Sequence, residues 1–297
     1  MDCLTLDIGG TKTAAAWWQG GLLLQRREEP TAGDAPALLE QLARMLSGGP
    51  PVQCVGAAVT GVTDGRRVGV LNRQMIGGWD GLPLAEHLEQ LLGVPAWLLN
   101  DAQAAAWGEY RARADAPADL LFVTVSTGIG AGIVLDGRLR SGSTGLAGHL
   151  GHGGARAAGG GQAPGSACSC GRGDCLEWRA SGSAMARDLA ALGLGLRSAR
   201  AWMAAPHQDH PAVQDWLDRA TRAVAEAIAD AHALLDLHGV LLGGGLGLHP
   251  RFLQGVQRAM LALPARFRVP VDAARLGSDA GLRGMACWLQ DRPDASD

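Results

Sequence analysis

A short turn near the N-terminus carries the first residues that could do chemistry. It lies between an apolar run over residues 3–8 and a second run over residues 13–18, and it reads Asp-Ile-Gly-Gly-Thr-Lys. Glycines permit a positive φ, which lets backbone N–H groups converge on an anion such as a phosphate. The spacing is not that of a Walker loop, and a plain hairpin turn with a capping threonine also fits. The residues predicted to contact nucleotide are Asp7, Gly9, Gly10, Thr11 and Lys12, with the Asp7 carboxylate near a bound magnesium.

A second turn with the same ingredients lies near the middle of the chain. An apolar strand is expected over Leu120–Val125 and a returning strand over Ala131–Leu135, with small residues between them. Two strand–turn–strand units more than a hundred residues apart indicate a duplicated architecture. Two such hairpins that face each other across a cleft can hold phosphates from both sides. The nucleotide contacts predicted in this turn are Thr127, Gly128, Gly130 and Gly132.

Asn100 and Asp101 lie where a short strand, Pro95–Leu99, runs directly into a helix that continues to about Arg113. A carboxylate at the end of a strand and the start of a helix points out of the sheet. Position alone favours an ordinary helix cap. Together with the two phosphate turns, however, Asp101 is predicted to be the general base that accepts a hydroxyl proton during phosphoryl transfer.

Three cysteines, Cys168, Cys170 and Cys175, lie within eight residues and are separated by glycines and polar residues. Three thiolates at this spacing can wrap one tetrahedral zinc ion, and a histidine upstream, His149 or His152, can supply the fourth ligand. Such a closed site is structural rather than catalytic. Free thiols or a redox pair are the alternative. The other cysteines are isolated in apolar stretches and are expected in the core.

Two further features have weaker signals. Glu177 follows Cys175 by two residues and is either held rigidly beside the metal loop or an ordinary surface charge. Gly244 lies at the centre of three glycines that end an apolar strand over Gly239–Leu242. There the backbone can approach a flat ligand such as adenine, although close helix–strand packing explains the glycines equally well.

The remaining pattern predicts an α/β protein of two domains, 1–117 and 118–297. A weak linker candidate, Ala114–Ala118, separates them, and the last helix can pack back on the first domain. Capping residues, helical spacing and stop signals predict helices from Asp34 to Leu46, over Leu82–Leu92, over Ala212–Leu237 and over Asp279–Leu289.

The net charge, the pI and the lengths of the apolar runs exclude several classes of function. A net charge of −3 and a pI near 6.2 over 297 residues leave no basic face for nucleic acid. Apolar runs are interrupted well before the ~18 residues of a membrane span, and the N-terminus lacks the charged and apolar regions of a signal peptide. A cytoplasmic protein without nucleic-acid or membrane partners is therefore expected.

Taken together, these residues resemble the ROK family of sugar kinases, repressors and open reading frames over essentially the whole chain. The resemblance implies an actin-like ATPase fold, which is ribonuclease H-like, with an interdomain cleft. It also implies Mg-ATP as donor, the 6-hydroxyl of a hexose as acceptor, a structural zinc and a homodimer. The motifs that carry it are Asp7–Lys12, Asn100-Asp101, Ser126–Gly130, His149–His152, Cys168–Glu177, Gly243–Gly245 and Asp279–Leu282.

The same resemblance assigns roles to individual residues. Asp101 is the base, and His152 completes the zinc site with the three cysteines. The sugar contacts that it implies are Asn100, His152 and Glu177, and we also predict contacts from Gly61, Asn72 and His149.

His149 departs from the family pattern, because most members carry a glutamate that hydrogen-bonds the sugar at this position. The chain is similar here to the bacterial N-acetylmannosamine kinases, which have Ala-Gly-His-x-Gly-His as in Ala147–His152. Phosphorylation of N-acetylmannosamine is thus expected, with an N-acetylglucosamine kinase or glucokinase as the alternative. The stretch Gly153–Ala167 is about six residues longer than the family pattern, yet loop closure depends weakly on length, so His152 is still favoured as a zinc ligand.

Proteins of two other kinds share this fold. A sugar-sensing repressor needs a helix-turn-helix module ahead of the first strand. Here the first strand is expected to begin at about Cys3, which leaves no room for such a module. A catalytically dead sugar-binding protein is disfavoured because Asp101 and both phosphate turns are intact.

Overall fold

The computed structural model describes residues 1–71, 78–114, 116–155 and 168–292. The chain divides into two compact units. The first comprises Met1–Asp115, Leu139–Ala147 and Ser278–Asp297, and the second comprises Ala116–Arg138 and Gly148–Gly277. This division differs from a single cut after residue 117, because two later segments cluster with the first unit.

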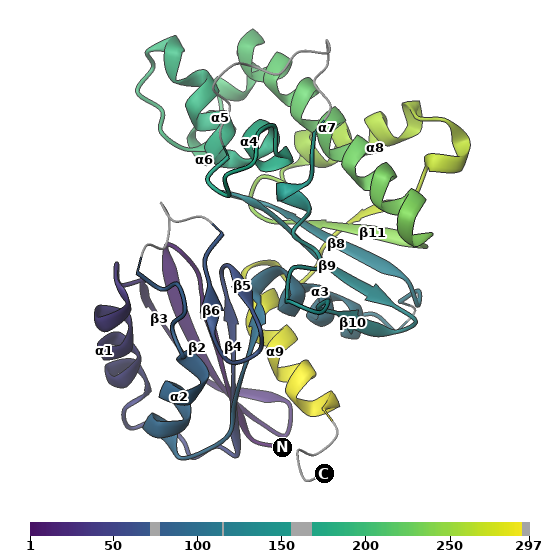
Figure 1. Ribbon diagram of the computed structural model, residues 1–297. Helices are drawn as coiled ribbons and strands as arrows, with labels where there is room; N and C mark the ends of the chain where they lie inside the picture. The colour runs from purple at the N-terminus through teal and green to yellow at the C-terminus, as the bar shows by residue number, and fades with distance from the viewer. Residues whose placement is uncertain (72–77, 115, 156–167, 293–297) are drawn as a thin grey trace. The chain divides into compact units, whose positions relative to one another are not determined.

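The first unit is built on a five-stranded sheet with the order β3-β2-β1-β4-β7 (Figure 1). Its first three strands form the meander expected from the sequence, with β1 antiparallel to β2 and β2 antiparallel to β3. The strands β4 and β7 then add in parallel. The strands are β1 (Cys3–Ile8), β2 (Lys12–Gln19), β3 (Leu22–Pro30), β4 (Cys54–Val59) and β7 (Ala96–Asn100), beside a small hairpin of β5 (Val62–Thr63) and β6 (Val68–Gly69).

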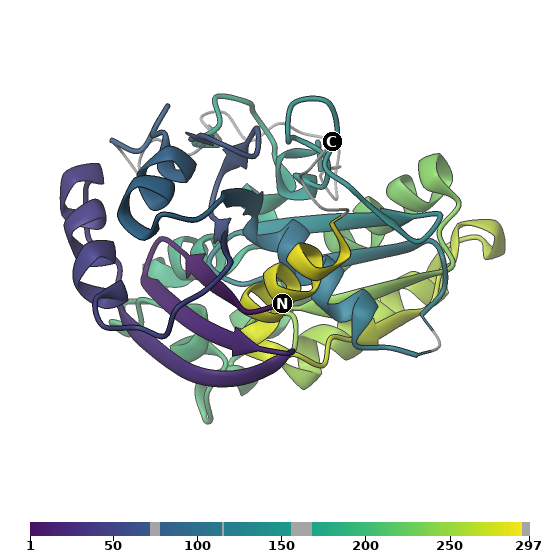
Figure 2. The ribbon, with the colours of Figure 1, turned by 90° about the horizontal axis from the view of Figure 1, so that it is seen from below.

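Helices cover both faces of this sheet. Alternate residues of β1 point to opposite faces, so that Leu4, Leu6 and Ile8 pack in the cluster with α1 (Ala35–Leu46) and α2 (Leu84–Leu92). The other face packs against α9 (Ala280–Asp291), which also lies beside α3 (Asp101–Arg111), as Figure 2 shows with α9 in yellow. The last helix therefore belongs to the first unit.

The second unit repeats the sheet. Its strand order, β10-β9-β8-β11-β12, has the same plan, with β8 antiparallel to β9 and parallel to β11, and β11 parallel to β12. Two sheets of one topology in one chain confirm that the architecture is duplicated. The strands are β8 (Leu120–Val125), β9 (Ile129–Leu135), β10 (Arg138–Arg140), β11 (Gly239–Gly243) and β12 (Val271–Ala273).

The core of the second unit lies between this sheet and several helices. Leu121, Val123 and Val125 of β8 are buried with apolar residues of α7 and α8. The helices are α4 (Leu176–Ala180), α5 (Gly182–Leu189), α6 (Ala199–Trp202), α7 (Pro211–Leu235) and α8 (Pro250–Ala262), with short 3₁₀ turns η1 (Leu150–His152), η2 (Ala190–Leu192), η3 (His207–Asp209), η4 (Ala265–Phe267) and η5 (Gly277–Asp279).

Local signals in the sequence account for where the first helices begin and end. The Asp34 carboxylate accepts a hydrogen bond from the N–H of Ala37 and caps α1, and Gly93 ends α2 in the left-handed conformation. None of the helices in the described part of the chain combines the length and apolar character needed to cross a bilayer.

Candidate active site and metal centre

Asp101 lies at the edge of the first sheet where parallel strands end. Its Oδ2 accepts a hydrogen bond from the Thr60 hydroxyl at 3.0 Å, one residue beyond the end of β4. Its Oδ1 accepts from the Asn100 amide at 3.0 Å and from the N–H of Ala102 at 2.8 Å. Three donors and the start of α3 stabilise the carboxylate anion and fix its orientation.

Asn100, rather than Asp101, is the N-cap of α3. Its carbonyl oxygen accepts from the N–H groups of Ala102 at 3.0 Å and Gln103 at 3.2 Å. Its amide donates to the carbonyl of Gly61 at 2.9 Å and to Asp101. These four bonds use the two donors and two acceptors of the side chain, so a sugar contact from Asn100, which stays a prediction, needs one of them to be exchanged.

The two remaining sugar contacts predicted in the first unit, Gly61 and Asn72, stay predictions. The backbone of Gly61 has a φ of 109°, a conformation that favours glycine, and its carbonyl is held by Asn100 beside the base. Asn72 lies outside the described residues.

Asp7 lies on β1 close to Asp101. Burial and then the charge of Asp101 raise the pKa of the Asp7 carboxyl from 3.8 to about 7, against the opposing effect of Lys12. Asp7 therefore holds its proton over a range in which an ordinary aspartate is ionised.

This shift predicts a pH-dependent gain in stability for Asp7→Asn. In the unfolded chain Asp7 loses its proton near the ordinary pKa, whereas in the folded chain it does so only near neutral pH. Ionisation of Asp7 therefore lowers the free energy of unfolding. This loss grows as the pH rises toward 7 and is complete above it. In calorimetry without magnesium, the melting temperature of the variant should exceed that of the wild type by more at pH 8 than at pH 5.

Asp64→Asn is a matched control. Backbone hydrogen bonds from Arg67 and Arg66 lower the pKa of Asp64, so its titration lies below this pH window. Its effect should be the same at both pH values. A constant difference for Asp7→Asn would contradict the raised pKa.

The first turn is closed by one backbone hydrogen bond and by one from a side chain. Gly9 donates to the carbonyl of Lys12 at 3.0 Å, and the Thr31 hydroxyl donates to the carbonyl of Gly9 at 2.7 Å. Gly10 and Thr11 form its exposed tip. The expected positive φ is wrong for Gly9, which lies outside the left-handed region. The Lys12 ammonium forms an ion pair with Glu28 at 3.0 Å, so its predicted phosphate contact requires that pair to open.

The second turn is tied to Glu177. The Glu177 carboxylate accepts a hydrogen bond from the N–H of Ile129 at 2.9 Å. A Cβ on Gly128 would lie 2.4 Å from the same carboxylate oxygen, so position 128 needs glycine for space rather than for a positive φ. Glu177 is thus neither a surface charge nor held by the metal loop alone.

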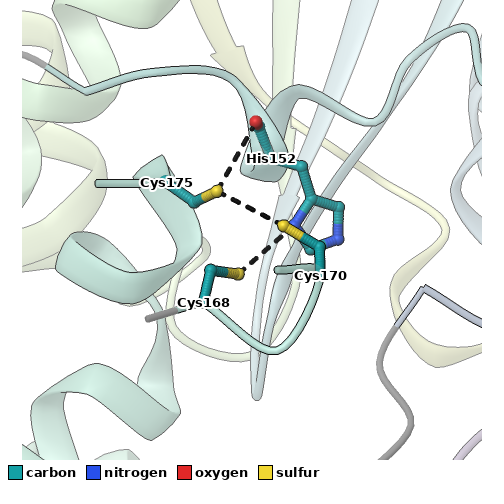
Figure 3. A group of neighbouring side chains, drawn as sticks. All are labelled: His152, Cys168, Cys170 and Cys175. Carbon is teal, nitrogen blue, oxygen red and sulfur yellow. Dashed lines mark hydrogen bonds between the residues drawn. The ribbon is translucent and has the colours of Figure 1, made fainter. Parts of the chain in front are cut away.

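The cysteine cluster converges with one histidine. Figure 3 shows His152 with Cys168, Cys170 and Cys175, whose ligand atoms all lie within 4.8 Å of one another. The Sγ of Cys168 lies 3.5 Å from Nδ1 of His152, and the Sγ atoms of Cys170 and Cys175 are 3.6 Å apart. Ligands of a tetrahedral zinc with Zn–S bonds near 2.3 Å are about 3.8 Å apart.

The chemistry of these four groups also fits a cation. Burial raises the pKa of the Cys168 and Cys175 thiols, so their thiolate forms need a positive partner. Burial lowers the pKa of His152, and the neutral imidazole is the form that binds metals. His149 is not part of this group but stacks on His152, with ring centroids 6.4 Å apart.

A pocket of about 840 Å³ lies in the second unit beside the second turn. Its volume suits a nucleotide-sized ligand. Gly245 and Leu246 contribute to its wall, while Gly244 itself, with a φ of 83°, packs so closely on β8 that a Cβ would lie 2.4 Å from the carbonyl of Val125. The other residues of the wall include Ser126, Thr127, Gly182, Ser183, Arg197, Arg200, Met203 and His249.

The profile of the ROK family matches residues 3–292 of this sequence. This chain belongs to the ROK family. The predicted membership and the actin-like ATPase fold are thereby confirmed, in agreement with the two repeated sheets.

Known members of the ROK family resemble this one over their full length. The N-acetylmannosamine kinase of Salmonella paratyphi B is 38% identical over an alignment 301 residues long, which covers 98% of this chain and 99% of the relative. A ROK family glucokinase from Streptomyces griseus, solved with glucose and AMPPNP, has a TM-score of 0.81 and 30% identity, covering 97% of this chain and 99% of that one. A ROK hexokinase from Thermus thermophilus has a TM-score of 0.78 and 32% identity, covering 98% and 100%.

Sequence reasoning missed several residues of this ROK protein's candidate site. Thr60 has a detectable signal, because it follows β4 as Asp101 follows β7, and Val59 pairs with Asn100 in the sheet. Gln103 is buried and donates to the carbonyls of Gly145 and Ala147, but its sequence context has no signal that marks it. Ser183 on α5, Arg197 in the loop before α6 and Arg200 on α6 also lack such a signal, because short motifs do not mark these segments.

Proposed function

We propose that this protein transfers the γ-phosphoryl group of ATP to the 6-hydroxyl of N-acetylmannosamine. The observation that carries the proposal is 38% identity over nearly the full length to N-acetylmannosamine kinases, joined to an aspartate held at the end of a parallel strand. The glucokinase with bound AMPPNP, at 30% identity, supports ATP as the donor.

Asp101 acts as the general base in this proposal. Its carboxylate accepts the proton of the sugar 6-hydroxyl while that oxygen bonds to the γ-phosphorus, and the bond from that phosphorus to the bridging oxygen breaks to release ADP. The donors Thr60, Asn100 and the N–H of Ala102 keep the carboxylate in place during the transfer. A magnesium ion, when bound, neutralises phosphate charge.

We assign the phosphates of ATP to the two turns, and its adenine ring to the 840 Å³ pocket of the second unit. The first unit supplies Asp7, Gly9, Gly10, Thr11 and Lys12. The second supplies Thr127, Gly128, Gly130 and Gly132, with Gly244 behind the pocket wall. Backbone N–H groups at the turns are suitable partners for phosphate oxygens. Each unit thus acts as one domain of the kinase.

The sugar is assigned to His149, His152 and Glu177 in the second unit and to Asn100, Gly61 and Asn72 in the first. A histidine at position 149 offers one hydrogen bond as donor or acceptor, whereas a glutamate offers two acceptor oxygens. We infer that this difference favours N-acetylmannosamine over glucose.

The four ligands His152, Cys168, Cys170 and Cys175 are proposed to hold a structural zinc. Cys170→Ser should lose the metal, which is expected at about one zinc per chain in the wild type, because a hydroxyl is a poor replacement for a thiolate. Sugar affinity should fall with it, since His152 and Glu177 belong to that loop.

Cys287→Ser provides the control for this prediction, because Cys287 lies outside the cluster. It should keep the metal in elemental analysis and bind sugar as the wild type does. A wild-type protein without metal, together with normal sugar binding by Cys170→Ser, would leave the cluster as free thiols.

The product identifies the reaction most simply. Incubation with Mg-ATP and N-acetylmannosamine should give ADP and, by phosphorus and proton NMR, a 6-phosphate. Equal ADP release with and without sugar would contradict the proposal.

We also propose a cytoplasmic location, which agrees with the use of ATP. The homodimer stays a prediction, which light scattering can test.

A further inference from the structure

The segment that follows the cysteine cluster is hydrogen-bonded to the second turn at three places. The N–H of Ile129 donates to the Glu177 carboxylate at 2.9 Å. In the opposite direction, the N–H of Gly182 donates to the carbonyl of Ser126 at 2.7 Å, and the N–H of Ser183 donates to the carbonyl of Thr127 at 3.1 Å. The shape of this turn therefore depends on the segment 177–183.

Glu177 is the only one of these three partners that acts through its side chain. Its backbone is fixed by the cysteine loop, because it lies in the first turn of α4, of which Cys175 is the N-cap. Leu176 also donates to the carbonyl of Gly153 at 3.0 Å, next to His152. A short chain of contacts thus connects the four metal-binding groups to Ile129.

The turn that Glu177 holds is also part of the wall of the 840 Å³ pocket. Ser126 and Thr127 contribute to that wall together with Gly182 and Ser183. Any change in the turn therefore alters the pocket that we assign to the nucleotide, as well as the N–H groups assigned to its phosphates.

We propose that Glu177 is a positioning residue for the phosphate donor, which connects the metal loop and the sugar to the second turn. The proposal rests on the proposed function. Because the carboxylate accepts a hydrogen bond from the N–H of Ile129, the turn is ordered before the nucleotide binds. Nucleotide binding therefore loses less free energy to ordering of the turn. A sugar that contacts Glu177 restricts the same side chain, so sugar and nucleotide strengthen each other's binding reciprocally.

Two substitutions separate the hydrogen bond from the charge. Glu177→Gln keeps a carbonyl oxygen that can accept from Ile129, whereas Glu177→Ala keeps no acceptor. Isothermal titration of the metal-loaded protein with AMPPNP and magnesium, without sugar, should show roughly tenfold weaker binding for Glu177→Ala. Glu177→Gln should bind AMPPNP within about twofold of wild type. With N-acetylmannosamine present, wild type should bind AMPPNP more tightly, and Glu177→Ala should lose this gain.

Zinc content and a control variant complete the test. Both Glu177 variants should keep the zinc content of wild type, because the four ligands are intact. Asp215→Ala removes an exposed carboxylate from α7 of the same unit and should bind AMPPNP as wild type does.

The proposal is overturned if Glu177→Ala binds AMPPNP as well as wild type, if Glu177→Gln binds as weakly as Glu177→Ala, or if either variant loses its zinc. Failure of the wild type to bind AMPPNP at all contradicts the proposed function itself.

Discussion

Asp101→Asn is expected to lower kcat by roughly 10²–10⁴-fold, the usual effect of removing a general base. Asparagine has nearly the same size and keeps one oxygen for its neighbours, but it has no carboxylate to accept the hydroxyl proton. Binding of AMPPNP and N-acetylmannosamine should change little, because the substitution removes an interaction that matters mainly in the transition state.

Thr60→Val serves as the matched comparison, because it removes the hydroxyl that orients Oδ2 of Asp101 and keeps the base. Its kcat should fall by less than that of Asp101→Asn. Steady-state rates of ADP release, with affinities from titration calorimetry, distinguish the two variants. A near-normal kcat for Asp101→Asn would remove this residue from the mechanism.

His149→Glu is expected to shift preference toward glucose or N-acetylglucosamine. The carboxylate supplies two acceptor oxygens where the imidazole supplies one hydrogen bond at most. A hydrogen bond to a buried sugar hydroxyl corresponds to about 1–3 kcal/mol, or roughly 5- to 150-fold discrimination. The ratio of kcat/KM for N-acetylmannosamine to that for glucose should fall by a factor in this range.

His149→Gln provides the control for charge and size, since it offers one carbonyl oxygen and no carboxylate. Its ratio should change much less than that of His149→Glu. Zinc analysis of both variants is needed as well, because His149 stacks on His152. If His149→Glu keeps the wild-type ratio with its zinc in place, position 149 does not select the sugar.

Features with local causes could be predicted from the sequence. The Asp34 cap, the Gly93 stop and the meander at the N-terminus depend on neighbouring residues, and the structure shows each of them. The cysteine cluster is local as well, because three of its four ligands lie within eight residues. Its fourth ligand is separated from Cys168 by 16 positions, and the resemblance to a known family was needed to choose His152 over His149.

Features that depend on distant contacts could not be predicted in this way. Glu177 contacts Ile129 across 48 positions in the sequence. Lys12 pairs with Glu28 on the neighbouring strand, and the sequence around neither residue indicates the register of the two strands. The use of Asn100 as a cap was missed for another reason. Asparagine and aspartate both cap helices well, so adjacent residues of these types leave the choice to tertiary structure.

The kinetic parameters of the wild-type protein for N-acetylmannosamine, N-acetylglucosamine and glucose, at saturating Mg-ATP, test the central claim most directly. Our account predicts the highest kcat/KM for N-acetylmannosamine. A preference for glucose by an order of magnitude would contradict the assignment of the sugar.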